Sequence, residues 1–215
     1  MEILEKFKDI IQPIHTPFII EFGSCTGEYT RVIADILQLS TKEYTFHCFE
    51  PNPDTLSKVV DKLQYYLISN SKNVRLFNEA ICSTVGKVNF YKSTNPTYYG
   101  SSSIRRPNLV KKTWNDMTFS FVQANGVTFD YHLQRTGFTE RPIDFVFCDI
   151  QGGELDLIDG GKQAFKNVRY IYMAYCDSEM YGGQLSLQKI CEHLPDFEII
   201  HDYKSHVLLK NKNRQ

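Results

Sequence analysis

Short apolar runs alternate with helix-patterned segments along most of this chain. Runs typical of buried strands lie at residues 18–22, 44–49, 74–77, 143–148 and 170–175. The segments between them carry apolar residues at helical spacing, such as Val32, Ile33, Ile36 and Leu37 after the first run. After the fourth run, a helix is expected to carry Leu155, Leu157, Ile158 and Phe165. This alternation is typical of an α/β protein whose mostly parallel sheet is covered by helices on both faces. In such sheets ligands bind beyond the carboxyl ends of the strands, so functional residues are expected directly after strands.

The two ends of the chain have patterns of their own. Residues 1–16 are predicted to hold an amphipathic N-terminal helix that Pro13 ends. The closing segment predicts a helix over 185–194 and then an antiparallel hairpin of 198–203 with 206–210.

A long polar stretch interrupts the middle of the chain. Residues 87–92 are interpreted as one arm of a hairpin, and residues 93–116 that follow are rich in Ser, Thr, Asn, Pro and Tyr. A connection of that length is unusual inside a compact domain, and we expect it to be an active-site loop. Residues 1–215 together are expected to form a single domain.

Charge and cysteine spacing exclude several classes of protein. The chain has 24 basic and 25 acidic residues, without the basic excess that neutralises phosphates, so nucleic acid is not expected as a partner. The six cysteines lack the close spacing of a zinc site, and Cys48 and Cys148 fall inside apolar runs, which favours a reducing compartment. The N-terminus is charged and every apolar run is too short for a membrane span. We therefore expect a cytoplasmic protein with no membrane partner.

The segment EFGSCTG at residues 21–27 carries the first chemical signal. An acidic residue, Glu21, ends a strand, and Gly23 and Gly27 allow a tight turn that a ligand can approach closely. The spacing is not that of the dinucleotide-binding fingerprint, so the turn suits a ligand without phosphate. S-adenosylmethionine is such a ligand, and Glu21 could attract its ammonium or sulfonium group. A plain strand-to-helix turn is the alternative reading.

Glu50 carries the second signal because it ends the second predicted strand. A carboxylate at this position can accept hydrogen bonds from both ribose hydroxyls of a nucleoside. An acidic residue after a strand can also be a solvated turn, and the preceding glycine loop favours the nucleoside-binding interpretation.

The segment CDIQGGE at residues 148–154 carries the third signal. Asp149 ends an apolar run, two glycines allow a tight turn, and Glu154 begins the next helix. Two carboxylates beside a cofactor could orient or deprotonate an acceptor hydroxyl. Glu154 could instead only complement the helix dipole.

These segments together resemble the FkbM-type family of class I S-adenosylmethionine-dependent methyltransferases. The matching stretches are IIEFGSCTGEYT (19–30), HCFEPNPDTL (47–56), VRLFNEAICSTVGKVNFY (74–91), GSSSI (100–104), VTFDYHL (127–133), IDFVFCDIQGGELDLIDGG (143–161) and YCDSEMYGGQ (175–184). The resemblance implies a Rossmann-like class I methyltransferase fold, with a mostly parallel seven-stranded sheet and a C-terminal antiparallel hairpin. It also implies methyl transfer to oxygen, often a hydroxyl of a sugar or of a glycosylated or polyketide product, and is compatible with fusion to glycosyltransferase-type domains or association with them.

The resemblance assigns cofactor-binding roles by position. Glu50 would hold the ribose, Glu79 and Ala80 would border the adenine, and Ser102 or Ser103 would reach the amino acid end. The full expected set is Glu21, Gly23, Ser24, Gly27, Thr30, Glu50, Pro51, Asn52, Glu79, Ala80, Ser102, Ser103, Asp149 and Gln151.

The chain departs from the family's pattern at two positions. Gln151 stands where relatives often carry Glu, although Gln is also a familiar variant. Relatives usually have an acidic residue at the end of the fifth strand, where this chain has Ala174. If that acid contacts the acceptor or a metal, this chain has lost the contact, and Asp177 or Glu179 would have to replace it.

The expected catalytic residues are Asp149 as the base, with Glu154 and His132 as lesser candidates. His132 falls in a helical segment, where a structural role is the more natural reading. A metal-dependent alternative would place Mg²⁺ on Asp149 and Asp177, although no third carboxylate is obvious. A non-catalytic cofactor-binding module of a larger enzyme is a further alternative, which Ala174 keeps open.

Overall fold

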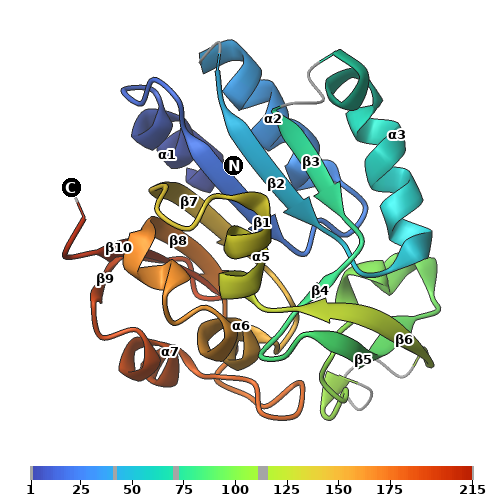
Figure 1. Ribbon diagram of the computed structural model, residues 1–215. Coiled ribbons are helices and arrows are strands. Elements are labelled where there is room, and N and C mark those ends of the chain that lie inside the picture. The colour runs from blue at the N-terminus through green and yellow to red at the C-terminus, as the bar shows by residue number, and fades with distance from the viewer. Residues whose placement is uncertain (1, 41–42, 70–72, 111–115, 215) are drawn as a thin grey trace.

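The computed structural model describes residues 2–40, 43–69, 73–110 and 116–214. At its centre is a seven-stranded sheet with the strand order β3-β2-β1-β7-β8-β10-β9 (Figure 1). The first five strands in that order are parallel, and β10 and β9 join antiparallel. The strands are β1 (Phe18–Phe22), β2 (Thr45–Phe49), β3 (Val74–Phe77), β7 (Ile143–Cys148), β8 (Val168–Ala174), β9 (Phe197–Asp202) and β10 (His206–Asn211). The predicted mostly parallel sheet with a C-terminal antiparallel hairpin is confirmed.

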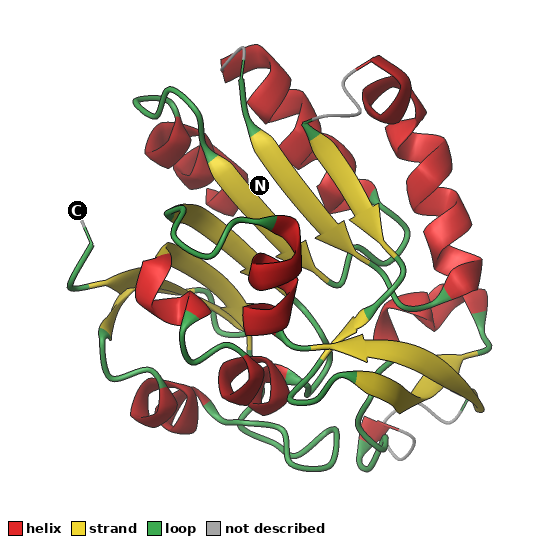
Figure 2. Cartoon of the chain, in the orientation of Figure 1, coloured by secondary structure: helices red, strands yellow, loops and turns green. Residues whose placement is uncertain are grey.

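Helices cover both faces of this sheet, as predicted (Figure 2). One face is covered by α1 (Glu2–Ile11), α2 (Glu28–Ser40) and α3 (Pro53–Ser69), and the other by α5 (Phe129–Thr136), α6 (Glu154–Gly160) and α7 (Leu187–His193). Strand β1 shows the reason, because alternate side chains of a strand point to opposite faces. Phe18 and Ile20 pack in the core under α5 and α6, whereas Ile19 packs under α1 and α2. Every residue of β1 is therefore buried.

A second, three-stranded sheet lies beyond the carboxyl ends of β2 and β3 (Figure 1). Its order is β4-β6-β5, with β4 at Ala80–Ile81, β5 at Gly86–Ser93 and β6 at Phe119–Val127. The predicted hairpin arm corresponds to β5, whereas β6, its antiparallel partner, was not predicted. Within the predicted loop 93–116, a 3₁₀ helix, η1 (Pro96–Ser101), follows β5, and residues 111–115 lie outside the described residues.

Helix ends account for the other differences from the prediction. The N-terminal helix, expected within residues 1–16 and ended by Pro13, stops at Ile11, just before that proline. The helix after β7 was expected to reach Phe165, but α6 ends at Gly160 and Phe165 lies in a separate 3₁₀ helix, η2 (Ala164–Asn167). A Cβ atom on Gly160 would lie 2.3 Å from the Cys82 carbonyl oxygen, so the close approach of these two segments requires glycine.

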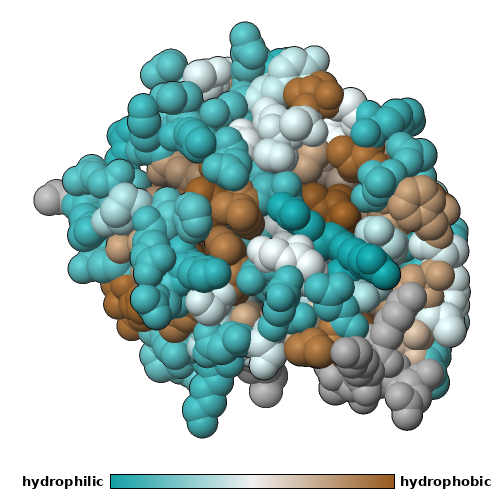
Figure 3. Space-filling model, turned by 90° about the horizontal axis from the view of Figure 1, so that it is seen from below, coloured by the Kyte–Doolittle hydropathy of each residue, from teal (hydrophilic) through white to brown (hydrophobic). Residues whose placement is uncertain are grey.

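The outer surface is mainly polar on the face seen from below in Figure 1. On that face, apolar atoms form separate, partly recessed areas among hydrophilic side chains (Figure 3). Among the described residues, no helix combines the length and apolar character that crossing a bilayer requires.

Candidate active site

Three neighbouring strands bring the predicted carboxylates to one edge of the sheet. Strands β2, β1 and β7 are adjacent and parallel, so Glu50, Glu21 and Asp149 reach the same carboxyl-end rim. The turns are joined there by backbone hydrogen bonds, in which Asp149 N–H donates to Phe22 O (3.0 Å) and Glu50 N–H donates to Phe77 O (3.0 Å).

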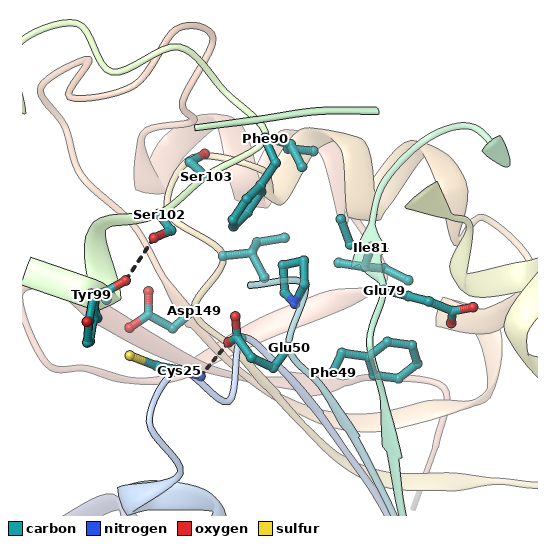
Figure 4. Close-up of a pocket in the computed structure, with 16 residues that line it drawn as sticks. Cys25, Phe49, Glu50, Glu79, Ile81, Phe90, Tyr99, Ser102, Ser103 and Asp149 are labelled. Atoms are coloured by element: carbon teal, nitrogen blue, oxygen red, sulfur yellow. Dashed lines mark hydrogen bonds between the residues drawn. The ribbon is translucent and has the colours of Figure 1, made fainter. Parts of the chain in front are cut away.

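A cleft opens at this rim, and we call it the rim cleft (Figure 4). In Figure 4, Asp149, Cys25 and Tyr99 stand at one end of the cleft, with Phe49 and Glu79 at the other. Predicted cofactor-binding residues that line it are Gly23, Glu50, Pro51, Glu79, Ala80, Ser102, Ser103 and Asp149. Side chains that the sequence did not single out also line it, namely Cys25, Phe49, Ile81, Phe90, Ile104 and Ile150.

The glycine turn that borders the cleft cannot carry side chains at its two glycines. Gly23 has a φ of +91°, and a Cβ there would lie 2.1 Å from the Asp149 carbonyl oxygen. Gly27 has a φ of +83°, and its Cβ would lie 3.1 Å from Val59 Cα. The turn after β1 and the turn after β7 therefore touch through bare backbone at Gly23, which leaves the rim open to a ligand.

Glu21 lies buried beneath this turn. Its Oε2 accepts hydrogen bonds from Ser24 Oγ (2.8 Å) and Thr30 Oγ1 (2.6 Å). Burial raises the pKa of Glu21 to about 7 because the charged form loses solvation. Ser24 and Thr30, which we expected to bind cofactor, hold this carboxylate in place.

Glu50 is also buried and is held by backbone donors. Cys25 N–H donates to its Oε2 (2.6 Å) and Asn52 N–H to its Oε1 (2.8 Å). Burial raises the pKa of Glu50 to about 7, against the opposing effect of these hydrogen bonds. Asn52 itself does not line the rim cleft, and its Oδ1 accepts from Asp54 N–H at the start of α3 (3.1 Å).

The segment after β3 forms the Glu79 end of the cleft, and η1, which carries Tyr99, lies at the Asp149 end (Figure 4). Glu79 is paired with Arg135 of α5, whose Nη1 donates to Glu79 Oε1 (2.7 Å). Ser102 Oγ donates to the Tyr99 carbonyl (3.0 Å), and Ser103 Oγ donates to the Gln151 carbonyl (2.6 Å). Ser103 therefore ties the segment after η1 to the turn after β7, whereas Ser102 bonds back to η1 itself.

Asp149 and Glu154 belong to the same turn but differ in environment. The Asp149 side chain is about half exposed (48%), and Gln151 Nε2 donates to its Oδ1 (2.6 Å). Glu154 is fully buried; its Oε1 accepts from Gly152 N–H (3.1 Å), and its Oε2 has no partner within the described residues. Burial raises the pKa of Glu154 to about 7. The structure thus places Asp149 in the cleft, and Glu154 and Gln151 outside its lining.

His132 lies in the protein core, away from the rim cleft. Its Nε2 is 2.9 Å from Nδ1 of His47, a buried residue of β2. Burial lowers the pKa of His132 to about 3 and that of His47 to about 2. The structure does not bring His132 to the reacting centre that we expected for a base, because its ring is enclosed by this imidazole and by Phe49 and Phe77.

A second cavity, of about 290 Å³, opens on the other side of Asp149. It shares Gly23, Cys25 and Asp149 with the rim cleft. The remaining lining residues are Glu21, Phe22, Ser24, Thr26, Glu28, Tyr29, Phe147, Cys148, Tyr172 and His206. Sequence reasoning did not single out Tyr172 or His206. The sequence did contain a signal for Tyr172. It lies two residues before Ala174 in the same strand, so the two side chains point to the same face of the sheet.

The alternative metal site has weak structural support. Within the described part of the chain, no group of three or more His, Cys, Asp or Glu side chains could hold a metal ion together. The Asp177 carboxylate accepts a hydrogen bond from Leu187 N–H at the start of α7 (3.3 Å).

A sequence profile described as "Methyltransferase FkbM domain" matches residues 21–206, which is most of the chain. The chain belongs to the FkbM methyltransferase family. A curated relative is the 2-O-methyltransferase NoeI of Sinorhizobium fredii (strain NBRC 101917 / NGR234), which is 30% identical over 204 residues and matches 91% of this chain and 79% of its own length. The family and the fold establish this protein as a methyltransferase, and they imply the use of S-adenosylmethionine.

Solved structures support the same fold for this FkbM methyltransferase. A methyltransferase FkbM from Methylobacillus flagellatus KT superposes with a TM-score of 0.57 at 13% identity, over 91% of this chain and 43% of that one. The METTL16 methyltransferase domain superposes with a TM-score of 0.52 at 10% identity, over 100% of this chain and 66% of that one. This chain thus spans less than half of the first structure and about two thirds of the second, and the likeness concerns the fold.

Proposed function

We propose that this FkbM methyltransferase transfers the methyl group of S-adenosylmethionine to a hydroxyl of a sugar, a glycan or a glycosylated small molecule. The observation that carries the proposal is the junction at Gly23, Cys25 and Asp149, where the rim cleft meets the second cavity. A cofactor in the rim cleft would present its reactive end at this junction, beside a separate space for an acceptor.

The residues of the rim cleft fit the cofactor group by group. Glu50 can accept hydrogen bonds from ribose hydroxyls, and the apolar walls formed by Phe49 and Ile81 suit an adenine ring. Glu21 lines the second cavity and not the rim cleft; it lies under the glycine turn beside the junction, where its carboxylate would favour the positively charged sulfur of the cofactor. When bound, S-adenosylmethionine supplies a methyl group activated by a positively charged sulfur.

The acceptor class is supported by two observations. NoeI, a relative of this chain, is named a 2-O-methyltransferase, which supports oxygen as the methylated atom. The second cavity combines aromatic side chains, Tyr29, Phe147 and Tyr172, with polar groups. Aromatic rings pack on the apolar faces of sugars while polar groups bind the hydroxyls, so this lining suits a sugar.

Mass spectrometry after incubation with isotopically labelled S-adenosylmethionine and a panel of glycans and small alcohols tests this proposal. We expect labelled O-methyl product from a carbohydrate acceptor, and calorimetric binding of both S-adenosylmethionine and its demethylated product. Tight binding of NAD in their place would overturn the proposal. Cofactor binding without product from every acceptor would favour the non-catalytic module, and activity lost on chelation and restored by Mg²⁺ would favour the metal-dependent alternative.

A further inference from the structure

The second cavity has a feature that the proposed function does not use, namely a histidine beside Asp149. His206 begins β10, and its Nε2 lies 3.8 Å from Asp149 Oδ2. We propose, on the basis of the proposed function, that the second cavity binds the acceptor sugar and that His206 takes the proton from its reacting hydroxyl, assisted by Asp149.

The backbone register brings His206 to this position. β10 pairs antiparallel with β8, and His206 is directly opposite Ala174. Opposite residues in a sheet project from the same face, so His206, Ala174 and Tyr172 all face the side of α2. Ala174 has only a methyl group, which cannot hydrogen-bond to the imidazole.

Two contacts hold the imidazole ring. It is stacked on Tyr172, with ring centroids 4.8 Å apart and an interplanar angle of 8°. Its Nδ1 is 3.0 Å from Ser205 Oγ. When Nδ1–H donates to this hydroxyl, Nε2 carries the free lone pair and faces Asp149 and the cavity.

Asp149 is arranged to assist the histidine. Gln151 Nε2 donates to Asp149 Oδ1 (2.6 Å), which leaves Oδ2 as the oxygen nearer to His206. A carboxylate at 3.8 Å would stabilise the imidazolium that forms when Nε2 gains a proton. The His206 side chain is about a quarter exposed (26%), so the proton can pass on to solvent.

The cavity is large enough for a small acceptor. Its volume of about 290 Å³ lies at the lower end of the range for small-molecule sites. Tyr29, half exposed at the start of α2, and Tyr172 provide aromatic surface, while Ser24 and Thr26 provide hydroxyl groups.

The proposed step balances in atoms and charge. The acceptor oxygen forms a bond to the methyl carbon, the carbon–sulfur bond breaks, and sulfur keeps the electron pair as a neutral thioether. The hydroxyl proton moves to Nε2 of His206, which becomes an imidazolium beside the Asp149 carboxylate.

The test compares His206→Asn with His201→Asn on the adjacent strand β9, whose side chain lies outside both cavities and is about half exposed (49%). Loss of a general base predicts a fall in kcat of about 10²–10⁴-fold for His206→Asn. The Kd for S-adenosylmethionine and the acceptor KM should change by less than about threefold, and His201→Asn should stay within about twofold of the parent kcat. A parent-like kcat for His206→Asn overturns the inference.

A second measurement does not depend on turnover. In protein labelled with ¹⁵N-histidine and saturated with the demethylated cofactor, a methyl glycoside of the sugar identified by mass spectrometry should shift the His206 ring resonances. Tyr172→Ala should weaken this shift, because the stacking surface is lost. Unchanged His206 resonances at saturating glycoside would overturn the acceptor assignment.

The outcomes separate this inference from the proposed function. Failure of the parent protein to bind S-adenosylmethionine would defeat the proposed function. Normal cofactor binding and product formation together with a fully active His206→Asn variant would defeat only the role of His206. Chelation that abolishes turnover, with rescue by Mg²⁺, would also defeat that role, because a cation would then activate the hydroxyl.

Discussion

His47 of strand β2 and Glu50, which directly follows that strand, are buried ionisable residues whose surroundings differ sharply. Burial favours the neutral form of each, and so it lowers the pKa of His47 to about 2 and raises that of Glu50 to about 7. His47 is surrounded by aromatic rings and contacts His132 (2.9 Å), and its Nε2 has no partner among the described residues. Glu50 has two backbone donors and faces the rim cleft.

The difference shows how one physical effect serves two purposes. In the core, desolvation keeps the imidazole pair neutral over the physiological range, so the two rings contribute mainly to packing, with polar contacts to each other and from Arg135 to His132. At the rim, desolvation gives a carboxylate a pKa near neutrality, so that a bound ligand with suitable donors can stabilise its charged form. The predictions below test this contrast.

The largest expected effect is on stability, from His132→Ala. The variant removes a buried ring and leaves His47 Nδ1 without its partner, which should lower the free energy of unfolding by roughly 3 kcal/mol. Denaturant unfolding measures this loss, with the exposed His193→Ala of α7 as the control. Folded His132→Ala should bind S-adenosylmethionine as the parent does, and a large loss of affinity would contradict the division between core and rim.

Glu50→Gln is expected to affect cofactor affinity, whereas His132→Ala is expected to affect stability. Loss of the charged acceptor should weaken S-adenosylmethionine binding by about 1.5–3 kcal/mol, because hydrogen bonds to charged groups are the strong ones. Calorimetry gives the affinity, and the exposed Asp61→Asn of α3 is the matched control. Unchanged affinity would remove Glu50 from the binding site.

The carboxylates at the rim also predict how affinity depends on pH. The pKa values of Glu21 and Glu50 are raised to about 7 in the free protein, so both gain protons as the pH falls below that value. If the cofactor binds their ionised forms, Kd should increase by up to about tenfold per pH unit for each group below pH 7. Titrations between about pH 8 and about pH 6 test this, and Glu50→Gln should show a shallower dependence. Equal affinity at both ends of that range would contradict the proposed charge state.

The smallest effect on stability is expected for Arg135→Gln, because Arg135 lies between the core and the rim cleft. Arg135 pairs with Glu79 at the end of the rim cleft and lies 3.2 Å from His132 Nδ1 in the core. Because this ion pair is partly exposed, Arg135→Gln should cost less than about 1 kcal/mol of stability. Thermal unfolding and calorimetry together would show whether it also changes cofactor affinity; a loss larger than that of Glu50→Gln would mean that the core and the rim are strongly coupled.

The sequence predicted the features that depend on local pattern and on parallel-strand geometry. Glu21, Glu50 and Asp149 each follow an apolar run, and parallel strands bring such residues to one edge. Long-range pairing could not be predicted in the same way. The contact of His47 with His132 joins residues 85 positions apart, and His206 reaches Asp149 only through the register of β10 against β8.

Strand β6 was missed for a similar reason. Its sequence contains Gln123, Asn125 and Gly126, which weaken the apolar alternation of a strand. It is held by antiparallel pairing along all of β5, a partner distant in sequence. The burial of Glu154 could not be predicted from the sequence either, because an acidic residue at the start of a helix is usually solvated.

The narrow border between the two cavities has a consequence for how this protein can diversify. Only the backbone-dominated junction of Gly23, Cys25 and Asp149 is common to both linings. Thr26 and Tyr29, which line only the second cavity, can therefore be exchanged by mutation while the nucleoside contacts and the His206–Asp149 pair remain intact. Libraries that randomise these two positions should yield variants with altered acceptor choice from a scaffold whose cofactor use is preserved.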